Sequence, residues 1–447
     1  MTTTLFRRLI DEQELRDPRA FLPRFAEQAR LLAERDGDVR LATLVPAAST
    51  FEAWYYGQRL PNRDARRVLV AWLGHSIDRL WAPAPQTVAA SPGGAPECGS
   101  ADLHEMRRGA AMAARRARDF ALGAEQGQLG DETLGYLQDE VRRITAEYPK
   151  KPLSTLFDDL VAAQEDAFRL IEGGRARPSQ LQQLYLLSTL LSWHMAKACH
   201  DLGDGSSAMM HARAAGVSAE KAEHPALEAL VCGLKSLIAY WSGYGADAVF
   251  HARKGAAEHP QLRGTVSVWL PALEARAAAL LGDAAAAAAA VDQAARQREA
   301  VQPDDLDELG GLLTFPVEKQ LYYRVETDVL LGQTTAGTVP DAERAVEAFT
   351  DPTAPHWAFG DEAGSRCNLA VLRLHADELD GAADALRPVL DLPRAQRNRG
   401  IVISAQRVHH ALPRSPARSA LLARDLGEEL TQFSPATPPP AALPRRP

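Results

Sequence analysis

Two short segments combine aromatic side chains with a lysine, a combination that suits ligand binding. The residues are Tyr240, Trp241 and Tyr244 in AYWSGY, and Phe315, Lys319, Tyr322 and Tyr323 in FPVEKQLYY. Aromatic rings offer wide, rigid surfaces to apolar groups, and an ammonium pairs with a carboxylate. We therefore expect the two segments to bind a ligand. The alternative is that the rings fill the core between helices and that Lys319 is a surface charge.

Sequence signatures of catalysis and metal binding are missing. No GxxxxGK[ST] or HExxH motif occurs, and no Ser, Cys or Lys has the surroundings of a nucleophile elbow. His194 and His200 are six residues apart, which does not place them on one face of a helix. We expect packed or exposed rings there rather than metal ligands. The expected protein is therefore not an enzyme and uses no cofactor and no metal.

Composition limits the class of protein. The chain has 447 residues, of which 46% are hydrophobic and 24% are charged, and its net charge is −8. These values are ordinary for a globular protein and argue against a chain that is disordered throughout. An acidic chain does not coat nucleic acid along its whole length, although one local DNA-binding domain remains compatible with this charge.

Localisation is expected to be cytoplasmic. No stretch of 18 or more apolar residues occurs, so no membrane span is expected, and residues 1–8 lack the apolar core of a signal peptide. The four cysteines lie far apart without a CxxC pair. Such spacing favours free thiols in a reducing compartment over disulfides or a zinc site.

A proline- and glycine-rich segment divides the chain. Residues 82–100 contain four prolines and three glycines in 19 residues, which predicts a flexible linker. It separates a head, residues 1–81, from a body, residues 101–432. The tail, residues 433–447, is rich in proline and is expected to be disordered. The head carries 13 Lys+Arg against 11 Asp+Glu, so the excess of acidic residues belongs to the rest of the chain.

The body is expected to be all-α and repetitive. Apolar residues recur there at spacings of three and four, as in residues 104–120, 131–148 and 153–173. Alanines at equivalent places recur 39 or 40 residues apart, with one longer gap that predicts an insertion around residues 301–316: Ala208, Ala248, Ala287, Ala345 and Ala385. Small residues at fixed positions let paired helices approach closely. The pattern favours a lengthened tetratricopeptide-like (TPR-like) α-solenoid.

The head is expected to form a small helix-turn-helix domain. Helices are expected over residues 20–35, 48–55 and 65–74, with Ser49 in an N-cap and with Phe51, Trp54 and Leu60 in the core. Residues 48–55 would read bases through Ser49 and Thr50. The expected contacts to the DNA backbone are Gln58, Arg59, Arg63, Arg66 and Arg67.

An alternative for the head stays open. No Lys or Arg occurs between Arg40 and Arg59, and Glu52 would oppose DNA if it faced outward. The head is then a domain that has lost DNA affinity and docks a protein.

The chain resembles a family of actinobacterial regulators in which a divergent Xre-type helix-turn-helix precedes TPR-like repeats. The matching segments include TFEAWYYGQRLPNRDARRVLVAWLG in the head and AKACHDLGDGSSAM, FGDEAGSRCNLAVLRL and DGAADALRPVLDLP in the body. The resemblance covers residues 20–432. It implies sequence-specific DNA binding and control of secondary metabolism or development. The chain is also similar, more distantly, to quorum-sensing regulators whose repeat groove binds a short peptide.

These observations lead to one main expectation with alternatives. We expect a transcriptional regulator that binds a double-stranded DNA operator as a homodimer and senses a peptide, small molecule or protein in its repeat groove. The homodimer follows from operator geometry alone. The leading alternative is a TPR interaction adaptor with a degenerate head, and a third class is an enzyme that uses the solenoid as a shell.

Overall fold

The computed structural model is all-α, which confirms the expected fold class. It describes residues 4–12, 15–36, 41–57, 59–73, 77–82 and 129–433 except 334 and 336, and these residues contain helices and no strand. The expected linker, the helix over residues 104–120 and the tail beyond residue 433 lie outside the described residues. No helix in the described part of the chain is long and apolar enough to cross a membrane.

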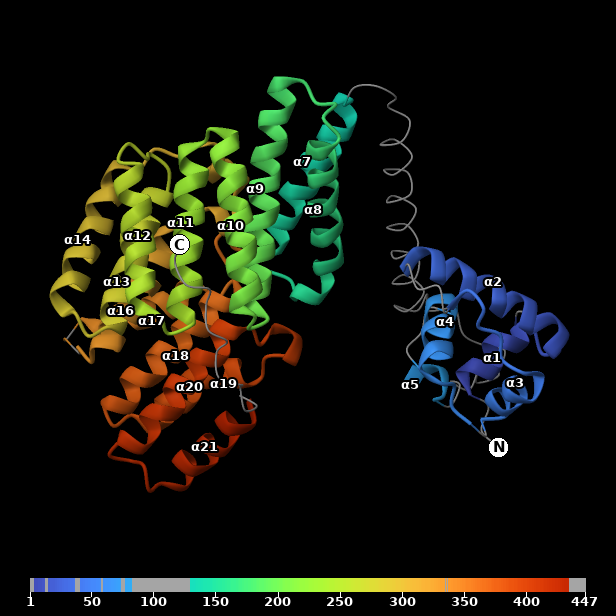
Figure 1. Cartoon of the computed structure of the whole chain (residues 1–447). Coiled ribbons are helices and arrows are strands. Elements are labelled where there is room, and N and C mark those ends of the chain that lie inside the picture. The colour runs from blue at the N-terminus through green and yellow to red at the C-terminus, as the bar shows by residue number, and fades with distance from the viewer. Residues whose placement is uncertain are drawn as a thin grey trace, which may run out of the picture. The chain divides into compact units, whose positions relative to one another are not determined.

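The chain divides into two compact units, residues 1–103 and 104–447. The helices of the first unit are α1 (Leu5–Glu12), α2 (Pro18–Asp36), α3 (Ala48–Tyr55), α4 (Arg63–Leu73) and α5 (Ile77–Leu80) (Figure 1). Aromatic rings dominate its core: Phe21 stacks on Phe51 at 3.9 Å between centroids, and Phe6 stacks on Trp81 at 4.7 Å. These contacts join α2 to α3, and α1 to Trp81, which follows α5.

Two details of the head differ from expectation. Helix α3 begins at Ala48 with Ala47 as its N-cap and has no side-chain cap, so Ser49 lies inside the first turn. Phe51 and Trp54 are buried as expected, but Leu60 is 49% exposed. The reason is that Leu60 lies in the non-helical link between α3 and α4, outside the helical register that buries the other two.

The second unit is built from helices that pack in consecutive pairs. Its described part starts with α7 (Asp131–Glu147) and α8 (Phe157–Glu172), with the short η2 (Leu153–Thr155) between them. The pairs that follow are α9 (Pro178–Asp201) with α10 (Gly205–Ala222), α11 (Pro225–Trp241) with α12 (Gly245–Glu258), α13 (Val266–Leu280) with α14 (Ala284–Ala300), α16 (Val317–Leu331) with α17 (Thr338–Ala348), α18 (Phe359–His375) with α19 (Leu379–Leu390), and α20 (Arg399–Ala411) with α21 (Leu421–Phe433). Short η4 (Arg394–Gln396) and η5 (Leu412–Arg414) flank α20.

Glycine turns join the members of the first three pairs. Gly203, Gly243 and Gly282 adopt φ values of 87°, 82° and 76°, a left-handed conformation that is easy only for glycine. In two of these turns an aspartate follows directly and caps the next helix: Asp204 accepts from the Ser207 amide, and Asp283 accepts from the Ala286 amide.

The recurring alanines lie on the second helix of successive pairs. All five are buried, at positions 208, 248, 287, 345 and 385 of α10, α12, α14, α17 and α19. A methyl group at each position lets the second helix lie close against its neighbours. The pattern therefore marks helix–helix contacts.

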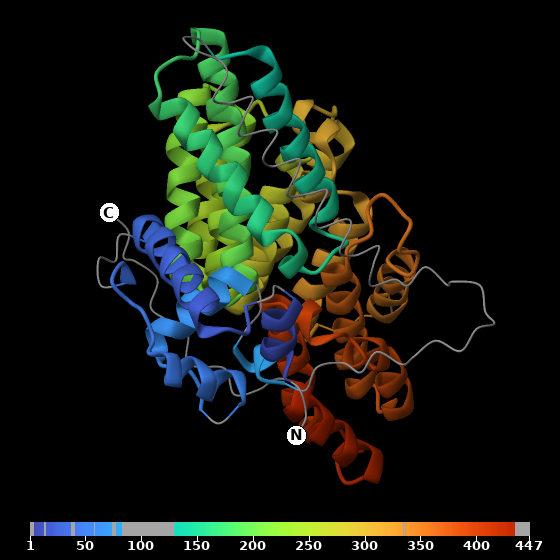
Figure 2. The same cartoon turned by 90° about the vertical axis from the view of Figure 1, so that its right-hand side faces the viewer.

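The first helices of the six pairs surround a common interior. Neighbouring members α9, α11, α13, α16, α18 and α20 pack in sequence, and α20 also contacts α9 and α11. The two views in Figures 1 and 2 show the later helices turning back beneath the earlier ones. The array thus closes around its inner side.

An inserted segment separates α14 from α16, where the longer gap predicted an insertion. It contains α15 (Asp305–Leu309) and η3 (Gly311–Leu313). Asp307 accepts from the Thr265 amide at 3.0 Å, and the Phe315 amide donates to the Thr265 hydroxyl at 2.9 Å. These bonds fix the insertion to the start of α13 and place Leu312, Thr314 and Phe315 in the wall of the interior.

Candidate functional site

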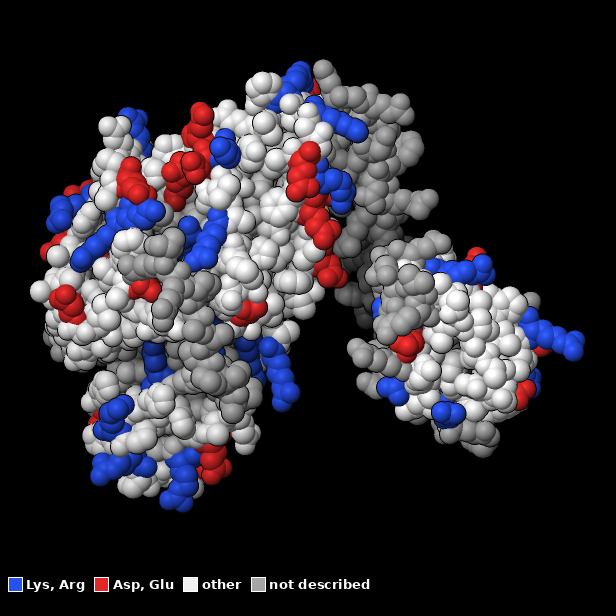
Figure 3. Space-filling view, viewed as in Figure 1, with Lys and Arg blue, Asp and Glu red and all other residues white. Residues whose placement is uncertain are grey.

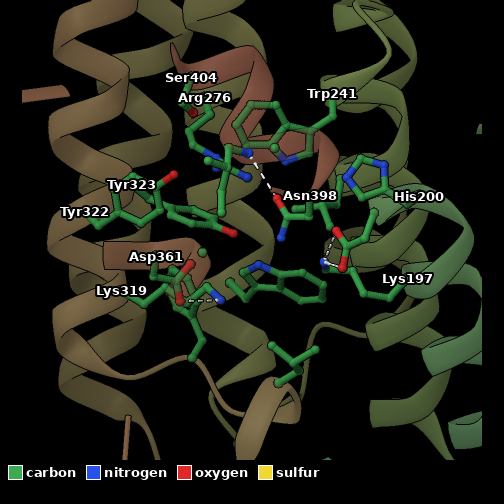
Figure 4. Close-up of a pocket in the computed structure, with 18 of the residues that line it drawn as sticks. Lys197, His200, Trp241, Arg276, Lys319, Tyr322, Tyr323, Asp361, Asn398 and Ser404 are labelled. Atoms are coloured by element: carbon green, nitrogen blue, oxygen red, sulfur yellow. Dashed lines mark hydrogen bonds and ion pairs between the residues drawn. The ribbon is translucent and has the colours of Figure 1, made fainter. Parts of the chain in front are cut away.

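The inner helices enclose a cavity of about 90 Å³, here called the interior cavity (Figure 4). All six first helices and the insertion contribute to its wall. Its polar and charged residues include Lys197, His200, Asp201, Arg276, Lys319, Asp361, Asn398 and Ser404, and its rings include Trp193, Trp241, Trp269, Phe315, Tyr322 and Tyr323.

A buried carboxylate organises one side of the cavity. Glu326 on α16 is 1% exposed and accepts from Arg276 at 2.7 Å, from Tyr240 at 2.8 Å and from Arg407. Arg407 also donates to the Tyr240 hydroxyl at 2.8 Å. Burial acts to raise the pKa of Glu326, but Arg276 and Arg407 outweigh it and lower that pKa. Glu326 is therefore ionised, and two arginines share its single charge.

Arg276 on α13 is the most unusual side chain of the cavity wall. It is 1% exposed and lies over the ring of Tyr323, with its guanidinium carbon 3.4 Å from the centroid and 4.6 Å from that of Tyr240. Figure 4 shows it between Tyr323 and Trp241. Its Nη1 is bound to Glu326, but its Nε and Nη2 have no hydrogen-bond partner. Such groups are rare in protein interiors and call for an explanation.

Trp269 provides a second buried donor without a partner. Its Nε1 has no acceptor, although the residue lines the same cavity as Arg276 and lies two helical turns before it on α13. An indole nitrogen can only donate a hydrogen bond. The wall thus offers N–H groups from two residues and lacks acceptors for them.

Two further ion pairs in the wall are neutral overall. The Lys319 ammonium lies 3.0 Å from Asp361, and the Lys197 ammonium lies 2.6 Å from Asp201, which also accepts from Tyr148 at 2.9 Å. Burial lowers the pKa of Lys319, but Asp361 outweighs burial and the net effect raises it. Lys319 is therefore charged and already neutralised, so Arg276 is the cation that remains available.

His200 completes this part of the wall as a neutral ring. Burial is the largest influence on it and lowers its pKa to about 4, with Lys197 and Arg399 acting in the same direction and Asp201 opposing them. The ring therefore adds no positive charge to the cavity near neutral pH.

Two glycines make room for the cavity rings. A Cβ on Gly233 of α11 would lie 2.4 Å from the Trp269 ring, and a Cβ on Gly364 of α18 would lie 2.2 Å from the Tyr322 hydroxyl oxygen. Both are far below ordinary van der Waals distance. The positions of Trp269 and Tyr322 thus depend on glycine in the neighbouring helix.

A larger cavity of about 450 Å³ adjoins the interior cavity. The two share Asp201 and Asn398, and the larger one is also lined by Lys151, Phe157 and Arg394. Asn398 accepts from the Ile401 amide at 3.0 Å and so begins α20 at this junction. Asp201 and Asn398 thus belong to the walls of both cavities.

The ligand residues expected from sequence are only partly brought together. Trp241, Lys319, Tyr322 and Tyr323 line the interior cavity. Tyr240 lies behind its wall, bonded to Glu326, and half-buried Tyr244 precedes α12 and packs against the apolar cluster that contains Tyr240, outside the cavity lining.

Sequence reasoning missed the central cation and its carboxylate. One signal was present: Arg276 is the only basic residue in α13, VSVWLPALEARAAAL, a helix that is apolar on nearly every face. A helix of that kind is normally buried on all sides, and so is an arginine within it. Glu326 had no comparable signal, because its surroundings come from three other helices.

The DNA-binding residues expected in the head lie on α3, α4 and the link between them. Ser49 is exposed, Thr50 is half-buried, and Arg59 and Arg66 are exposed, the last donating through Nε to the Pro61 carbonyl at 2.7 Å. Arg67 is half-buried and engaged with a neighbour. Gln58 and the side chain of Arg63 lie outside the described residues.

The charge around α3 is mixed. Glu52 is exposed on the same helix as Ser49. In the view of Figure 3, the basic side chains of the head stand singly and form no continuous patch. Contacts from this region to a phosphate backbone would come from a few separate arginines.

Thiols and metal-ligating groups show no assembled centre. Cys199, Cys232 and Cys367 are free. Burial raises the pKa of Cys367 to about 12, so this thiol is inert. Across the parts of the chain that the structure describes, no group of three or more His, Cys, Asp or Glu is placed to hold a metal ion.

Comparison of the chain with models of protein families, with characterised proteins and with solved structures gives no match.

Proposed function

We propose that this protein is a DNA-binding regulator of transcription whose helical body senses a ligand. The observation that carries the proposal is the combination, in one chain, of a small helical head with a separate compact body that encloses a polar cavity. Residues 1–81 contact an operator, and residues 101–432 bind the ligand and form a homodimer. The processes regulated are secondary metabolism or development, as the family resemblance implies.

The head supports this proposal through the surface around α3. The first turn of α3 exposes Ser49, a short polar side chain that can approach base edges. Arg59 and Arg66 are exposed on the following link and on α4, where they are available to phosphates. DNA binding by so few cations is expected to be weak and strongly dependent on salt.

Ligand and DNA are coupled through the body. A ligand that binds one conformation of the body better than another shifts the population toward it. In a dimer, such a shift changes the spacing of the two heads and hence their fit to paired half-sites. The buried charge cluster of Arg276, Glu326 and Arg407 supports this view, because it joins α13, α16 and α20 at the cavity wall.

The test is capture of genomic DNA fragments by the purified full-length protein, beside the triple variant Arg63→Ala, Arg66→Ala, Arg67→Ala. The expected result is enrichment of a discrete motif that weakens with rising salt and is lost in the variant. A matched control removes three α2 arginines instead: Arg19→Ala, Arg24→Ala, Arg30→Ala. Equal loss in both variants would indicate general electrostatics rather than a reading surface.

A second candidate is an adaptor whose head docks a protein. It is favoured by one observation: apolar side chains are exposed beside α3, with Val45 at 53%, Tyr56 at 45% and Leu60 at 49%. If the folded protein enriches no DNA motif at low salt, alone or with cell extract, direct operator binding is wrong. Loss of a partner's binding in Tyr56→Ser, Leu60→Ser would then support the adaptor.

A further inference from the structure

The charged groups around the interior cavity do not balance. Four are basic, namely Lys197, Arg276, Lys319 and Arg407, and three are acidic, namely Asp201, Glu326 and Asp361. The two lysine pairs are each neutral, so the surplus positive charge belongs to Arg276 and Arg407 around Glu326. The Arg407 side chain is 20% exposed and partly solvated, whereas Arg276 is 1% exposed, so the cost of the surplus charge falls on Arg276, where an anion in the cavity would offset it.

The unpartnered atoms of Arg276 specify the shape of this anion. Glu326 occupies Nη1, which leaves Nε and Nη2, the two nitrogens on one edge of the planar guanidinium. Two parallel N–H groups in one plane match the two oxygens of a carboxylate. The free Nε1 of Trp269 adds a donor in the same wall.

The rest of the wall specifies what the carboxylate carries. Trp193, Trp241 and Phe315 line the cavity together with Leu237 and Leu312, so apolar side chains stand beside the charged ones in this wall. A volume of about 90 Å³ holds a few heavy atoms beyond a carboxylate.

We infer that the interior cavity binds a small monocarboxylic acid, with its carboxylate on the Nε–Nη2 edge of Arg276 and its apolar part against the tryptophans. The bound carboxylate balances the charge of Arg276, Glu326 and Arg407 and gives the Nε–H and Nη2–H groups of Arg276 acceptors. Lys319 remains paired with Asp361 and does not contact the bound carboxylate. The inference rests on the proposed function only in naming the ligand class that the body senses.

Butyrate is the first probe, because its short chain suits the cavity, and butyramide is its uncharged counterpart of the same shape. Calorimetric titration of the full-length protein is expected to show binding of butyrate and at least tenfold weaker binding of butyramide. In protein labelled with ¹⁵N-arginine, the Nε–H signal of Arg276, assigned with the Arg276→Met variant, is expected to shift on addition of butyrate.

Three variants locate the contact. Arg276→Met is expected to weaken butyrate by about 10- to 100-fold; its fold is protected because Arg407 still neutralises Glu326. Trp269→Phe keeps a ring but removes Nε1, and a loss of about three- to tenfold is expected. The control Arg253→Met removes an exposed arginine that pairs with Glu274, and unchanged affinity is expected.

Several results would overturn the inference: equal binding of butyrate and butyramide, no binding of acetate through hexanoate, full competition by inorganic phosphate, or unchanged affinity in Arg276→Met and Trp269→Phe. Its failure is distinguishable from failure of the proposed function. If the protein captures a DNA motif but binds no carboxylic acid, only the ligand class is refuted. If it binds a carboxylic acid but captures no motif, only DNA binding by the head is refuted.

Discussion

Helix α11 contributes to the walls of two hollows that differ in volume and in how their charged side chains are satisfied. One is the interior cavity, which α11 meets through Leu237 and Trp241. The other, here called the α10–α12 groove, has a volume of about 780 Å³ and meets α11 through Cys232 and Lys235. The groove is more than eight times larger, yet none of its lining residues has a buried side-chain N or O atom without a hydrogen-bond partner.

The difference lies in where the charges are satisfied. Groove charges include Glu220, Asp247, Lys254 and Glu258, and both signs are interleaved on this part of the body in Figure 3. The pair Lys254 and Glu258 is 3.8 Å apart and half exposed, so water solvates it. Water cannot do the same for Arg276. A buried hydrogen-bond donor without a partner is therefore a more specific sign of a ligand site than the volume of a cavity is.

The largest expected effect comes from removing the buried carboxylate. In Glu326→Gln, Arg276 and Arg407 lose their common counter-charge while Arg276 stays buried at 1% exposure, so we expect a loss of about 3–5 kcal/mol in unfolding free energy. The matched change is Glu228→Gln in the groove, where the carboxylate is 3.5 Å from His259 and its side chain is 35% exposed. Its expected effect is below about 1 kcal/mol. Urea unfolding monitored by circular dichroism measures both, and similar losses would refute the comparison.

The second effect is a pH dependence that belongs to the cavity wall. The pKa of His200 is about 4 in the folded protein, against about 6.5 in an unfolded chain. At a pH between these two pKa values, His200 binds a proton in the unfolded state but not in the folded state. The unfolding free energy therefore falls as the pH drops from about 6.5 to about 4. The share of His200 is about 3 kcal/mol.

The check is a set of unfolding curves from pH 7 to pH 4 for the native protein, His200→Gln and His410→Gln. The first variant is expected to lose less stability on acidification than the native protein, whereas the exposed His410 is a control whose replacement leaves the slope unchanged. A slope in His200→Gln that equals the native slope would show that this ring does not resist protonation.

Much of the fold could be predicted from sequence because it depends on local patterns. Helical periodicity predicted the all-α class. The recurring Ala208, Ala248 and Ala287 predicted close contacts between helices, and all three are buried in the structure. The spacing also predicted the insertion that became α15 and η3. Each of these features appears in the sequence as a periodic or repeated pattern of residue types.

The cavity depends on distant residues, and sequence reasoning reached only its aromatic part. It chose Lys319 as the ligand-binding cation because lysine stood beside tyrosines, but Asp361, 42 positions away, already neutralises that lysine. Conversely, Glu326 receives Arg276 from 50 positions before it and Arg407 from 81 positions after it. Pairing at such separations is created by the turn-back of the helical array and leaves no local pattern.

The smallest effect contrasts two glycines that sit within helices on the two sides of this comparison. Alanine in a helix is favoured over glycine by about 1 kcal/mol, so each substitution starts with a gain. At Gly233 a methyl group would lie 2.4 Å from the Trp269 ring, and the expected overpacking of about 1–3 kcal/mol reverses that gain.

At Gly216, in the groove, the methyl group would lie 3.3 Å from the Lys235 ammonium, the far end of a flexible side chain that can move aside. We therefore expect Gly233→Ala to lower the melting temperature and alter tryptophan fluorescence, and Gly216→Ala to leave the spectrum unchanged with equal or slightly higher stability. If Gly233→Ala is as stable as Gly216→Ala and keeps the native spectrum, Trp269 has room to move. A rigid cavity wall, and with it the fixed position of the Trp269 donor, would then be wrong.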